Sequence, residues 1–303
     1  MLLLFPSGIV IIIYYEEKCP NRHFSVTLIQ QLQLKGDMIM ERKLLFFDID
    51  GTLLPGLNMP VPESTIAAIR RAQELGHYIF INTGRSKSVI PKEIAAMPFD
   101  GFLCGCGTHV TLHGNVLVDK EFDLARAKEL PLRARELGIG VVLEGNDFCY
   151  YDSKGALTEQ EITVFKSIFC DYPDRIKDTN ECDEYHYSKF CIYSTTKEKL
   201  TDLLLPFADY FEPIDRGDSF FEVVPVGYSK ASAIDTILAH LNQPLSDCYV
   251  FGDSSNDLSM LNHVPNSIAM GNSSPDVLAA ASYVTTPVWR DGIANAMKHF
   301  GLI

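Results

Sequence analysis

After the first forty residues, short apolar runs alternate with amphipathic segments along the chain. The run at residues 43–47 (KLLFF) is typical of a parallel strand that is buried on both faces. Residues 63–75 have helical spacing of apolar positions, with Glu63 or Ser64 available as a cap and Gly76 as a stop. The same reasoning predicts strands at 77–81, 102–104, 248–251 and 267–270, and helices at 230–241, 258–263, 275–281 and 294–300. This alternation favours an α/β fold with a doubly wound, mainly parallel, Rossmann-like sheet.

The middle of the chain, residues 120–222, has a different pattern, in which neighbouring strand candidates are mixed with helices. We expect strands at 140–143, 148–151, 187–193 and 220–224, and helices at 124–137, 159–169 and 197–207. Pro131 should break or kink the first of these helices. We therefore predict a core domain made of residues 40–119 and 223–303, with residues 120–222 as an inserted α+β domain.

The first 39 residues differ from the rest. Their uninterrupted apolar run, residues 9–15, is far short of the about 20 residues that a membrane span needs. No Lys or Arg precedes it and no small-residue cleavage site follows, so a signal peptide is poorly supported. Lys35-Gly36-Asp37 can be encoded by a purine-rich stretch that resembles a bacterial ribosome-binding site. We expect translation to start at Met40 or Met38 and residues 1–39 to be a non-native or unstructured leader; a short membrane-associated anchor is the alternative.

The charge balance excludes one broad class of partner. The 303 residues carry 26 Lys and Arg against 39 Asp and Glu, a net charge of −13, so the protein lacks the basic surface that nucleic-acid binding needs. The eight cysteines include no CxxC pair and are typical of free thiols in a reducing cytosol. We expect a cytoplasmic protein, monomeric or homodimeric, without a nucleic-acid or membrane partner.

Two carboxylates follow the first predicted strand. Asp48 and Asp50 are two residues apart, which places both side chains on the same side of an extended backbone. Sites in open α/β sheets form at the carboxyl ends of strands, and such a pair can bind a hard cation such as Mg²⁺ there. One carboxylate can then attack an electrophile while the other handles protons. A capping role is the alternative, but close carboxylates at a buried strand end repel each other unless a cation or a proton intervenes.

Three further polar groups are expected at the same edge of the sheet. Thr83-Gly84 ends the second strand and offers a hydroxyl and an unhindered N–H to phosphate oxygens. Lys230 opens a helix, where its ammonium adds to the helix dipole in favouring an anion. Gly252–Asp257 follows a third strand with two carboxylates and an amide. Alone, each could be an ordinary turn, cap or surface residue, but together they supply a nucleophile, metal ligands and phosphate anchors.

This set resembles the four ordered motifs of the haloacid dehalogenase superfamily, which here read Asp48-x-Asp50-Gly51-Thr52, Thr83-Gly84, Lys230 and Gly252-Asp253-x-x-Asn256-Asp257. The sequence is most similar to the Cof-like branch (subfamily IIB) of magnesium-dependent phosphatases, and the resemblance covers residues 43–300. It implies that residues 120–222 form a cap domain and that Mg²⁺ is the cofactor.

The resemblance also implies a role for each motif residue. Asp48 would be the nucleophile that forms an aspartyl-phosphate, and Asp50 would protonate the leaving alcohol and then activate water. Mg²⁺ would be held by the carboxylates of Asp48 and Asp253 and by the backbone carbonyl of Asp50. Thr52 would brace the loop, and Asp257 would orient Lys230 or a water molecule. The groups that would bind the phosphoryl group are the N–H groups of Ile49 and Gly84 and the side chains of Thr83, Lys230 and Asn256.

The sequence departs from the family pattern at Cys106-Gly107-Thr108-His109, where many Cof-like proteins have Asn-Gly-Ala. A nucleophilic Cys106–His109 pair is a minor alternative, because nothing supplies an orienting residue or an oxyanion hole. Arg85 either adds positive charge to the site or pairs with a neighbouring acid. Four cap residues are candidates to face the pocket, and an ordinary position on the cap surface or in the cap core is the alternative for each: Asn146, Tyr150, Tyr151 and Arg216. The basic residues of the cap show no recognisable cluster in the sequence: Lys154, Lys166, Arg175, Lys177, Lys189 and Arg216.

These residues predict hydrolysis of a small phosphorylated metabolite, such as a sugar phosphate, a polyol phosphate or a phosphorylated cofactor. Two alternatives remain open. A phosphomutase or phosphotransferase on the same scaffold would need cap residues that hold a second phosphate. A non-catalytic metabolite-binding protein is disfavoured because Asp48, Asp50, Lys230 and Asp253 are all present.

Overall fold

The computed structural model describes residues 2–4, 10–12 and 41–303. Strands β1 (Leu2–Leu4) and β2 (Val10–Ile12) pair antiparallel within a separate unit, Met1–Glu41. Arg42–Ile303 forms one compact unit. The predicted leader, residues 1–39, and its start site lie mostly outside the described residues. Among the described helices, none has the length and apolar character needed to cross a membrane.

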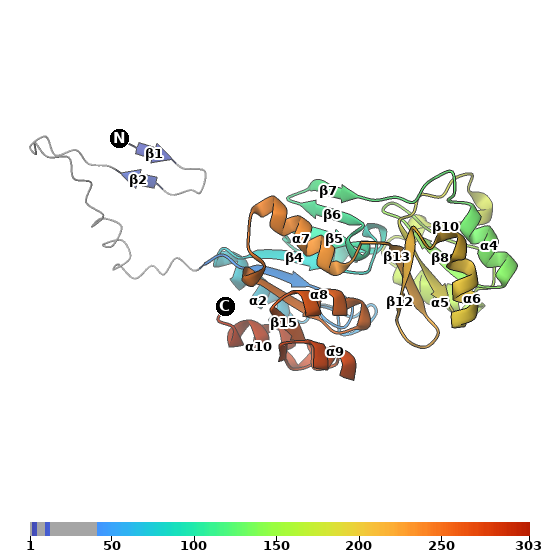
Figure 1. The fold of residues 1–303 in the computed structure, drawn as a ribbon. Helices are drawn as coiled ribbons and strands as arrows, with labels where there is room; N and C mark the ends of the chain where they lie inside the picture. The colour runs from blue at the N-terminus through green and yellow to red at the C-terminus, as the bar shows by residue number, and fades with distance from the viewer. Residues whose placement is uncertain (1, 5–9, 13–40) are drawn as a thin grey trace, which may run out of the picture. The chain divides into compact units, whose positions relative to one another are not determined.

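An eight-stranded sheet is the centre of the larger unit (Figure 1). Its order is β16-β15-β14-β3-β4-β5-β6-β7, parallel from β16 to β5 and antiparallel beyond. The strands are β3 (Leu44–Phe47), β4 (Tyr78–Asn82), β5 (Gly101–Cys104), β6 (His109–Leu112), β7 (Asn115–Asp119), β14 (Cys248–Gly252), β15 (Asn266–Ala269) and β16 (Tyr283–Val284). The chain runs outward from β3 in both directions, which confirms the predicted doubly wound, mainly parallel sheet.

Helices cover both faces of this sheet because its central strands are apolar on both sides. The helices are α2 (Glu63–Glu74), α3 (Lys92–Ala95), α7 (Lys230–Leu241), α8 (Leu258–His263), α9 (Pro275–Ala280) and α10 (Gly292–His299). In β3, Leu45 and Phe47 pack towards α2 and α10, whereas Leu44 and Phe46 pack towards α7, α8 and α9. The predicted cap of α2 is wrong: Pro62 holds the cap position, so Glu63 and Ser64 already lie in the first turn and no side chain caps the helix.

A second, six-stranded sheet is built from the middle of the chain, in the order β10-β9-β8-β11-β13-β12. Its strands are β8 (Gly140–Glu144), β9 (Cys149–Tyr151), β10 (Ile176–Asp178), β11 (Lys189–Tyr193), β12 (Phe211–Asp215) and β13 (Phe221–Pro225). Its helices are α4 (Glu129–Leu137), α5 (Glu159–Ile168) and α6 (Lys197–Leu204). Helix α4 begins five residues later than predicted, and Pro131 lies in its first turn, where a missing N–H costs nothing, so the predicted kink is wrong. Strands β10 and β12 were not predicted.

Side-chain alternation gives the six-stranded sheet two different faces. Phe190, Ile192 and Val223 pack with α4 and α6 in a hydrophobic core. Because successive residues of a strand point to opposite faces, Lys189 and Glu222 point the other way. They line a cavity together with residues at the carboxyl edge of the eight-stranded sheet.

Candidate functional site

The motif residues meet where three adjacent parallel strands end. Asp48 follows β3, Thr83 follows β4 and Asp253 follows β14, and these three strands are neighbours in the sheet. Their carboxyl ends therefore lie at one edge, as expected for an open α/β sheet. Lys230, the first residue of α7, reaches the same point and is fully buried.

Lys230 lies between two carboxylates. Its Nζ is 2.6 Å from an oxygen of Asp48 and 2.5 Å from an oxygen of Asp257. Burial alone would lower the pKa of Lys230, but Asp257 and Asp48 outweigh it and hold that pKa above its usual range. The ammonium therefore stays charged and fixes the Asp48 carboxylate.

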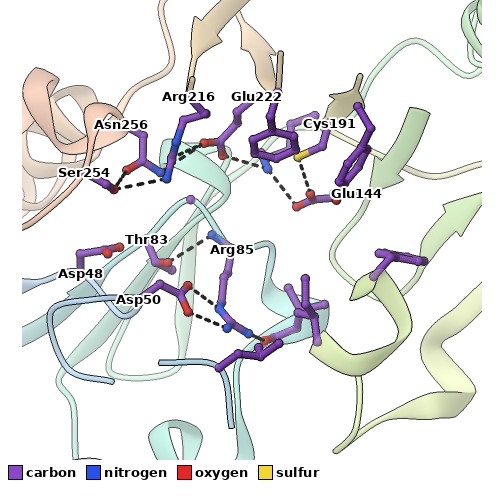
Figure 2. Close-up of a pocket in the computed structure, with 18 of the residues that line it drawn as sticks. Asp48, Asp50, Thr83, Arg85, Glu144, Cys191, Arg216, Glu222, Ser254 and Asn256 are labelled. Carbon is purple, nitrogen blue, oxygen red and sulfur yellow. Dashed lines mark hydrogen bonds and ion pairs between the residues drawn. The ribbon is translucent and has the colours of Figure 1, made fainter. Parts of the chain in front are cut away.

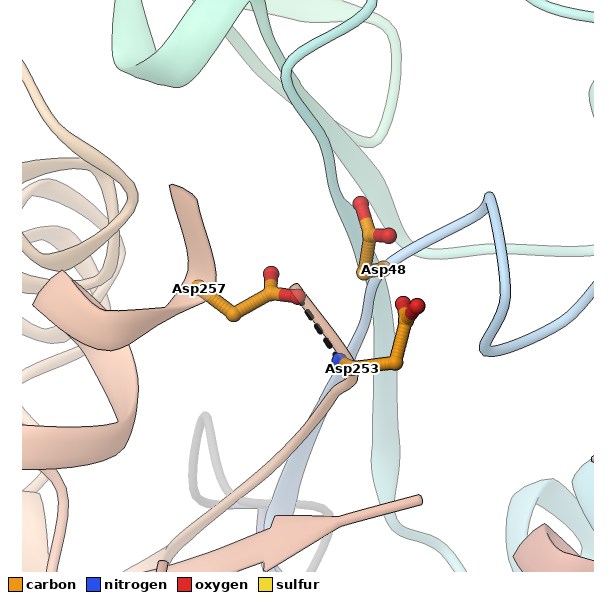
Figure 3. Close-up of side chains that lie close together, drawn as sticks. All are labelled: Asp48, Asp253 and Asp257. Carbon is orange, nitrogen blue, oxygen red and sulfur yellow. Dashed lines mark hydrogen bonds between the residues drawn. The ribbon is translucent and has the colours of Figure 1, made fainter. Parts of the chain in front are cut away.

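Three aspartates, Asp48, Asp253 and Asp257, lie close together (Figure 3), and their three carboxylates outnumber the single positive charge of Lys230. Asp48, Asp253 and Asp257 each offer one oxygen, and these atoms lie within 4.8 Å of one another. Burial raises the pKa of Asp48 to about 7, against the opposing effect of Lys230. Burial, followed by the charges of Asp48 and Asp257, raises the pKa of Asp253 to about 8. Such shifts are typical of carboxylates that are buried beside other carboxylates.

Asp257 and Thr52 hold this group in place. One Asp257 oxygen accepts the N–H groups of Asp253 at 2.8 Å and Ser254 at 2.9 Å, while the other contacts Lys230. The Thr52 hydroxyl donates to Asp253 at 3.1 Å. Gly51 has φ +78°, and a Cβ there would collide with the Asp253 carboxylate. Because Gly51 has no Cβ, the Asp253 carboxylate can lie against the turn that follows β3.

Asp50 points away from the other aspartates. Both of its oxygens accept hydrogen bonds from Arg85, each at 2.7 Å. Of the two predicted roles of Arg85, the structure has the ion pair with a neighbouring acid. The same pair lines the central cavity (Figure 2), so the positive charge of Arg85 also lies at the site.

The cavity lies between the two sheets and has a volume of about 240 Å³. Its wall from the eight-stranded sheet includes Asp48, Asp50, Thr83, Gly84, Arg85, Ser254 and Asn256. Its wall from the middle of the chain includes Glu144, Phe165, Phe169, Lys189, Cys191, Tyr193, Arg216, Phe220 and Glu222. Ile49, whose N–H is predicted to bind phosphate, follows Asp48 in the chain, and its side chain is fully buried.

A second buried lysine, Lys189, organises the cavity wall that comes from the middle of the chain, which we call the upper wall. Lys189 Nζ is 2.9 Å from Glu144 and 2.9 Å from Glu222. Glu222 also accepts hydrogen bonds from Arg216 at 3.0 Å and from Asn256 at 3.2 Å. Although burial alone would raise it, Lys189 and Arg216 lower the pKa of Glu222 to about 2. Glu222 is therefore an ionised carboxylate that joins the two walls (Figure 2).

Close packing explains the glycine at position 84. A Cβ there would lie 2.7 Å from the amide nitrogen of Asn256 and 2.8 Å from a Glu222 oxygen. Distances this short would force both side chains to move. Gly84 therefore provides space as well as an accessible N–H.

One expectation for the middle of the chain needs correction. Lys189 and Arg216 do cluster, because both contact Glu222. Among the four cap candidates only Arg216 is part of the cavity wall. Tyr150 is buried in a hydrophobic core, Tyr151 lies in another surface groove, and Asn146 bonds Asp119.

The alternative Cys106–His109 pair has no support in the structure. Cys106 donates to Glu222 at 3.4 Å, whereas His109 contacts Asp119 at 3.1 Å. Burial and the Glu222 charge raise the pKa of the Cys106 thiol well above its usual value. A thiol in that state is a poor nucleophile.

Glu144 and Glu222 were missed from the sequence, although a signal was present. Each is a charged residue in an otherwise apolar strand, GVVLE and FEVVP. Charged side chains are seldom buried without a partner. A buried strand that carries one therefore predicts an opposite charge nearby, which here is Lys189.

Comparison with known proteins agrees with this geometry. The sequence model of haloacid dehalogenase-like hydrolases matches residues 45–297. The protein named "Putative phosphatase YkrA" of Bacillus subtilis (strain 168) is 30% identical over 272 residues, which are 87% of this chain and 100% of that protein. The protein named "Putative bifunctional phosphatase/peptidyl-prolyl cis-trans isomerase" of Streptococcus pyogenes is 26% identical over 265 residues, which are 86% of this chain and 54% of that protein.

Solved structures give the same result. The subclass IIB sugar phosphatase BT4131 is 30% identical, with a TM-score of 0.73 over 86% of this chain and all of that one. A phosphoryl-transfer superfamily structure described for its trigonal-bipyramidal intermediate is 30% identical, with a TM-score of 0.74 over 87% of this chain and all of the other. The chain therefore belongs to the haloacid dehalogenase-like hydrolases, in the Cof-like branch (subclass IIB) that contains phosphatases.

Proposed function

We propose that this protein is a Mg²⁺-dependent phosphatase that hydrolyses small phosphorylated metabolites through an aspartyl-phosphate on Asp48. One observation carries the proposal: Asp48 is a buried carboxylate fixed by Lys230, at the base of a cavity that Thr83, Gly84 and Asn256 also line. The nucleophile and the proposed phosphate-binding groups thus line one cavity, and Lys230 contacts the nucleophile.

The acidic group fits a divalent cation. Asp48, Asp253 and Asp257 provide three carboxylates against the single charge of Lys230, and two of them have raised pKa values. Asp257 is already bound through both oxygens, which leaves the carboxylates of Asp48 and Asp253, with the Asp50 carbonyl, as the proposed ligands. Bound Mg²⁺ would supply positive charge that neutralises the oxygens of the transferring phosphoryl group.

The residues then divide the chemistry between them. An Asp48 oxygen bonds to phosphorus as the bond from phosphorus to the ester oxygen breaks, and Asp50 gives the leaving oxygen a proton. Asp50 later takes a proton from the water that hydrolyses the aspartyl-phosphate. Because Arg85 occupies both Asp50 oxygens here, the carboxyl must release at least one of those bonds before it exchanges a proton.

Phosphate recognition falls to groups around Asp48. We assign the side chains of Thr83, Lys230 and Asn256 and the N–H groups of Ile49 and Gly84 to the phosphoryl oxygens. Phosphoryl transfer depends mainly on positioning and charge neutralisation, and hydrogen-bond donors on a rigid sheet edge provide both.

The size of the cavity favours a small leaving group. The volume of about 240 Å³ is below the about 300–1,000 Å³ of sites for drug-sized ligands, and sugar, polyol or cofactor phosphates are suitable candidates. We propose that residues 120–222 act as the cap over this space.

A phosphomutase is less well supported. It would need spare positive charge in the upper wall for a second phosphate, yet Lys189 is bound to two glutamates and Arg216 reaches the loop after β14, beside the proposed site of the first phosphate. Phosphate release by the full chain, with and without Mg²⁺, tests the proposal on a panel of phosphorylated metabolites. We expect Mg²⁺-dependent release that Asp48→Asn abolishes and that the exposed control Asp209→Asn retains. Release by Asp48→Asn near that of the unchanged protein would overturn the proposal.

A further inference from the structure

Arg216 enters the cavity from the loop between β12 and β13 and reaches the opposite wall (Figure 2). Its Nη1 donates to Glu222 at 3.0 Å, and its Nη2 donates to the Ser254 hydroxyl at 3.2 Å. Ser254 lies between Asp253 and Asn256, within the loop that follows β14. The middle of the chain therefore inserts a guanidinium into the loop that carries metal and phosphate ligands.

Glu222 places this guanidinium beside a phosphate-binding group. The same Glu222 oxygen that accepts from Arg216 also accepts from the Asn256 amide, at 3.2 Å. The other Glu222 oxygen is fixed by Lys189 at 2.9 Å. Arg216 and Asn256 are thus neighbouring donors on one anchored acceptor.

Arg216 is also the least neutralised of the four cations that surround the site. Lys230 and Lys189 each contact two carboxylates, and Arg85 takes both oxygens of Asp50. Within the described part of the chain, Glu222 is the one carboxylate that pairs with Arg216, and Arg216 shares it with Lys189. Among the described residues its guanidinium makes two hydrogen bonds, so donors remain out of the five that an arginine carries.

We propose that Arg216 binds the transferring phosphoryl group directly, as a cation supplied by the middle of the chain to the site on the eight-stranded sheet. This inference rests on the proposed function. A guanidinium presents two parallel N–H groups to phosphate oxygens, and it neutralises charge that spreads over those oxygens during transfer. Bond making and breaking remain with Asp48 and Asp50.

Two other roles give different results. Arg216 could serve only as a structural tie between the two sheets, in which case its loss would lower stability and leave anion binding unchanged. It could instead contact the leaving group, in which case its loss would harm some substrates and spare others. Binding of a phosphoryl analogue that lacks a leaving group separates these roles from the proposed one.

The test uses the full chain with Mg²⁺ and orthovanadate as the probe. The dissociation constant of orthovanadate is measured by calorimetry for the unchanged protein, Arg216→Ala, Arg216→Lys and the control Arg133→Ala. Arg133 lies in α4 and bonds only the Asp202 carbonyl among the described residues. We expect about 10- to 100-fold weaker binding in Arg216→Ala, an intermediate value in Arg216→Lys and no change in the control.

Turnover provides a second readout. With Arg216→Ala, kcat/KM should fall by a similar factor for p-nitrophenyl phosphate and for hexose phosphates, and added guanidinium ion should restore part of it. Unchanged orthovanadate binding by folded Arg216→Ala would overturn the inference, as would a loss confined to one class of leaving group. If Arg216→Ala does not fold, unchanged binding by Arg216→Lys overturns it.

The failure of the proposed function would look different. An unchanged protein that releases no phosphate from any substrate, yet binds orthovanadate more tightly than Arg216→Ala, would end the phosphatase proposal and keep the role of Arg216 in anion binding.

Discussion

Two fully buried lysines, Lys230 in α7 and Lys189 in β11, make similar contacts and yet have opposite electrostatic surroundings. Lys230 lies between Asp48 and Asp257, and Lys189 lies between Glu144 and Glu222. Around Lys230 there are three carboxylates and one cation, and the pKa values of Asp48 and Asp253 rise to about 7 and about 8. Around Lys189 there are two carboxylates and two cations, and the pKa of Glu222 falls to about 2.

The difference shows what each wall can bind. The group around Lys230 lacks two positive charges, which is the charge of one divalent cation. The group around Lys189 is neutral as it stands, so it has no surplus of carboxylates for a metal ion. A buried lysine between carboxylates is therefore not a sign of a metal site; the surplus of carboxylates is.

Removing each lysine is the strongest way to break this comparison. Lys230→Met and Lys189→Met should each lower the free energy of unfolding by about 3–5 kcal/mol, because each leaves carboxylates buried without their partner. Only in Lys230→Met should Mg²⁺ restore more stability than it adds to the unchanged protein, since the unpaired Asp48 is a proposed ligand. Urea unfolding with and without Mg²⁺ measures both effects, and an equal Mg²⁺ gain in the two variants would contradict the charge count.

The same contrast explains what could be predicted from the sequence. Asp48, Asp50, Thr83, Lys230 and Asp253 stand at strand ends or a helix start, so the parallel topology alone brings them together. The doubly wound sheet was predictable because its central strands are continuous apolar runs. The boundaries of most elements moved by one or two residues.

The upper wall was not predictable in the same way. Glu144, Lys189 and Glu222 come from three strands whose pairing, β8 to β11 to β13, is antiparallel and non-sequential. Lys189 lies directly opposite Glu144 in the register, and Cys191 lies opposite Glu222. Only the register makes these residues neighbours, and the spacing along the chain does not reveal it. Strand β10 (IKD) escaped prediction because it has three residues, two of them charged, and β12 (FEPID) because Pro213 argues against a strand.

The raised pKa values give a pH-dependent prediction of intermediate size. The folded-state values of about 7 for Asp48 and about 8 for Asp253 lie above the ordinary 3.8, so without metal the folded protein binds more protons than the unfolded chain. The stability contributed by these groups is then present below about pH 4 and is lost as the pH rises through 7 to 8. The rise in Tm on adding Mg²⁺ should therefore grow between pH 5 and pH 8, because protons compete with the metal at the lower pH.

Thermal unfolding at several pH values, with and without Mg²⁺, measures this effect. Asp253→Asn removes one of the two titrating groups and should flatten the pH dependence of the metal-free protein. A Mg²⁺ gain that is constant from pH 5 to pH 8 would show that the carboxylates around Lys230 are already ionised, and the contrast with Glu222 would disappear.

The smallest expected effect concerns Cys106, whose thiol donates to Glu222. Many Cof-like proteins have asparagine at this position. Its φ is +54°, in the left-handed region that asparagine tolerates better than most residues. An asparagine amide could also donate to Glu222 in place of the weak thiol donor. Cys106→Asn should therefore keep its stability within about 1 kcal/mol, whereas Cys106→Val, of similar size but β-branched and unable to donate, should lose about 1–2 kcal/mol or more. Urea unfolding of the two variants decides the point, and equal losses would mean that neither the backbone conformation nor the contact with Glu222 selects the residue at this position.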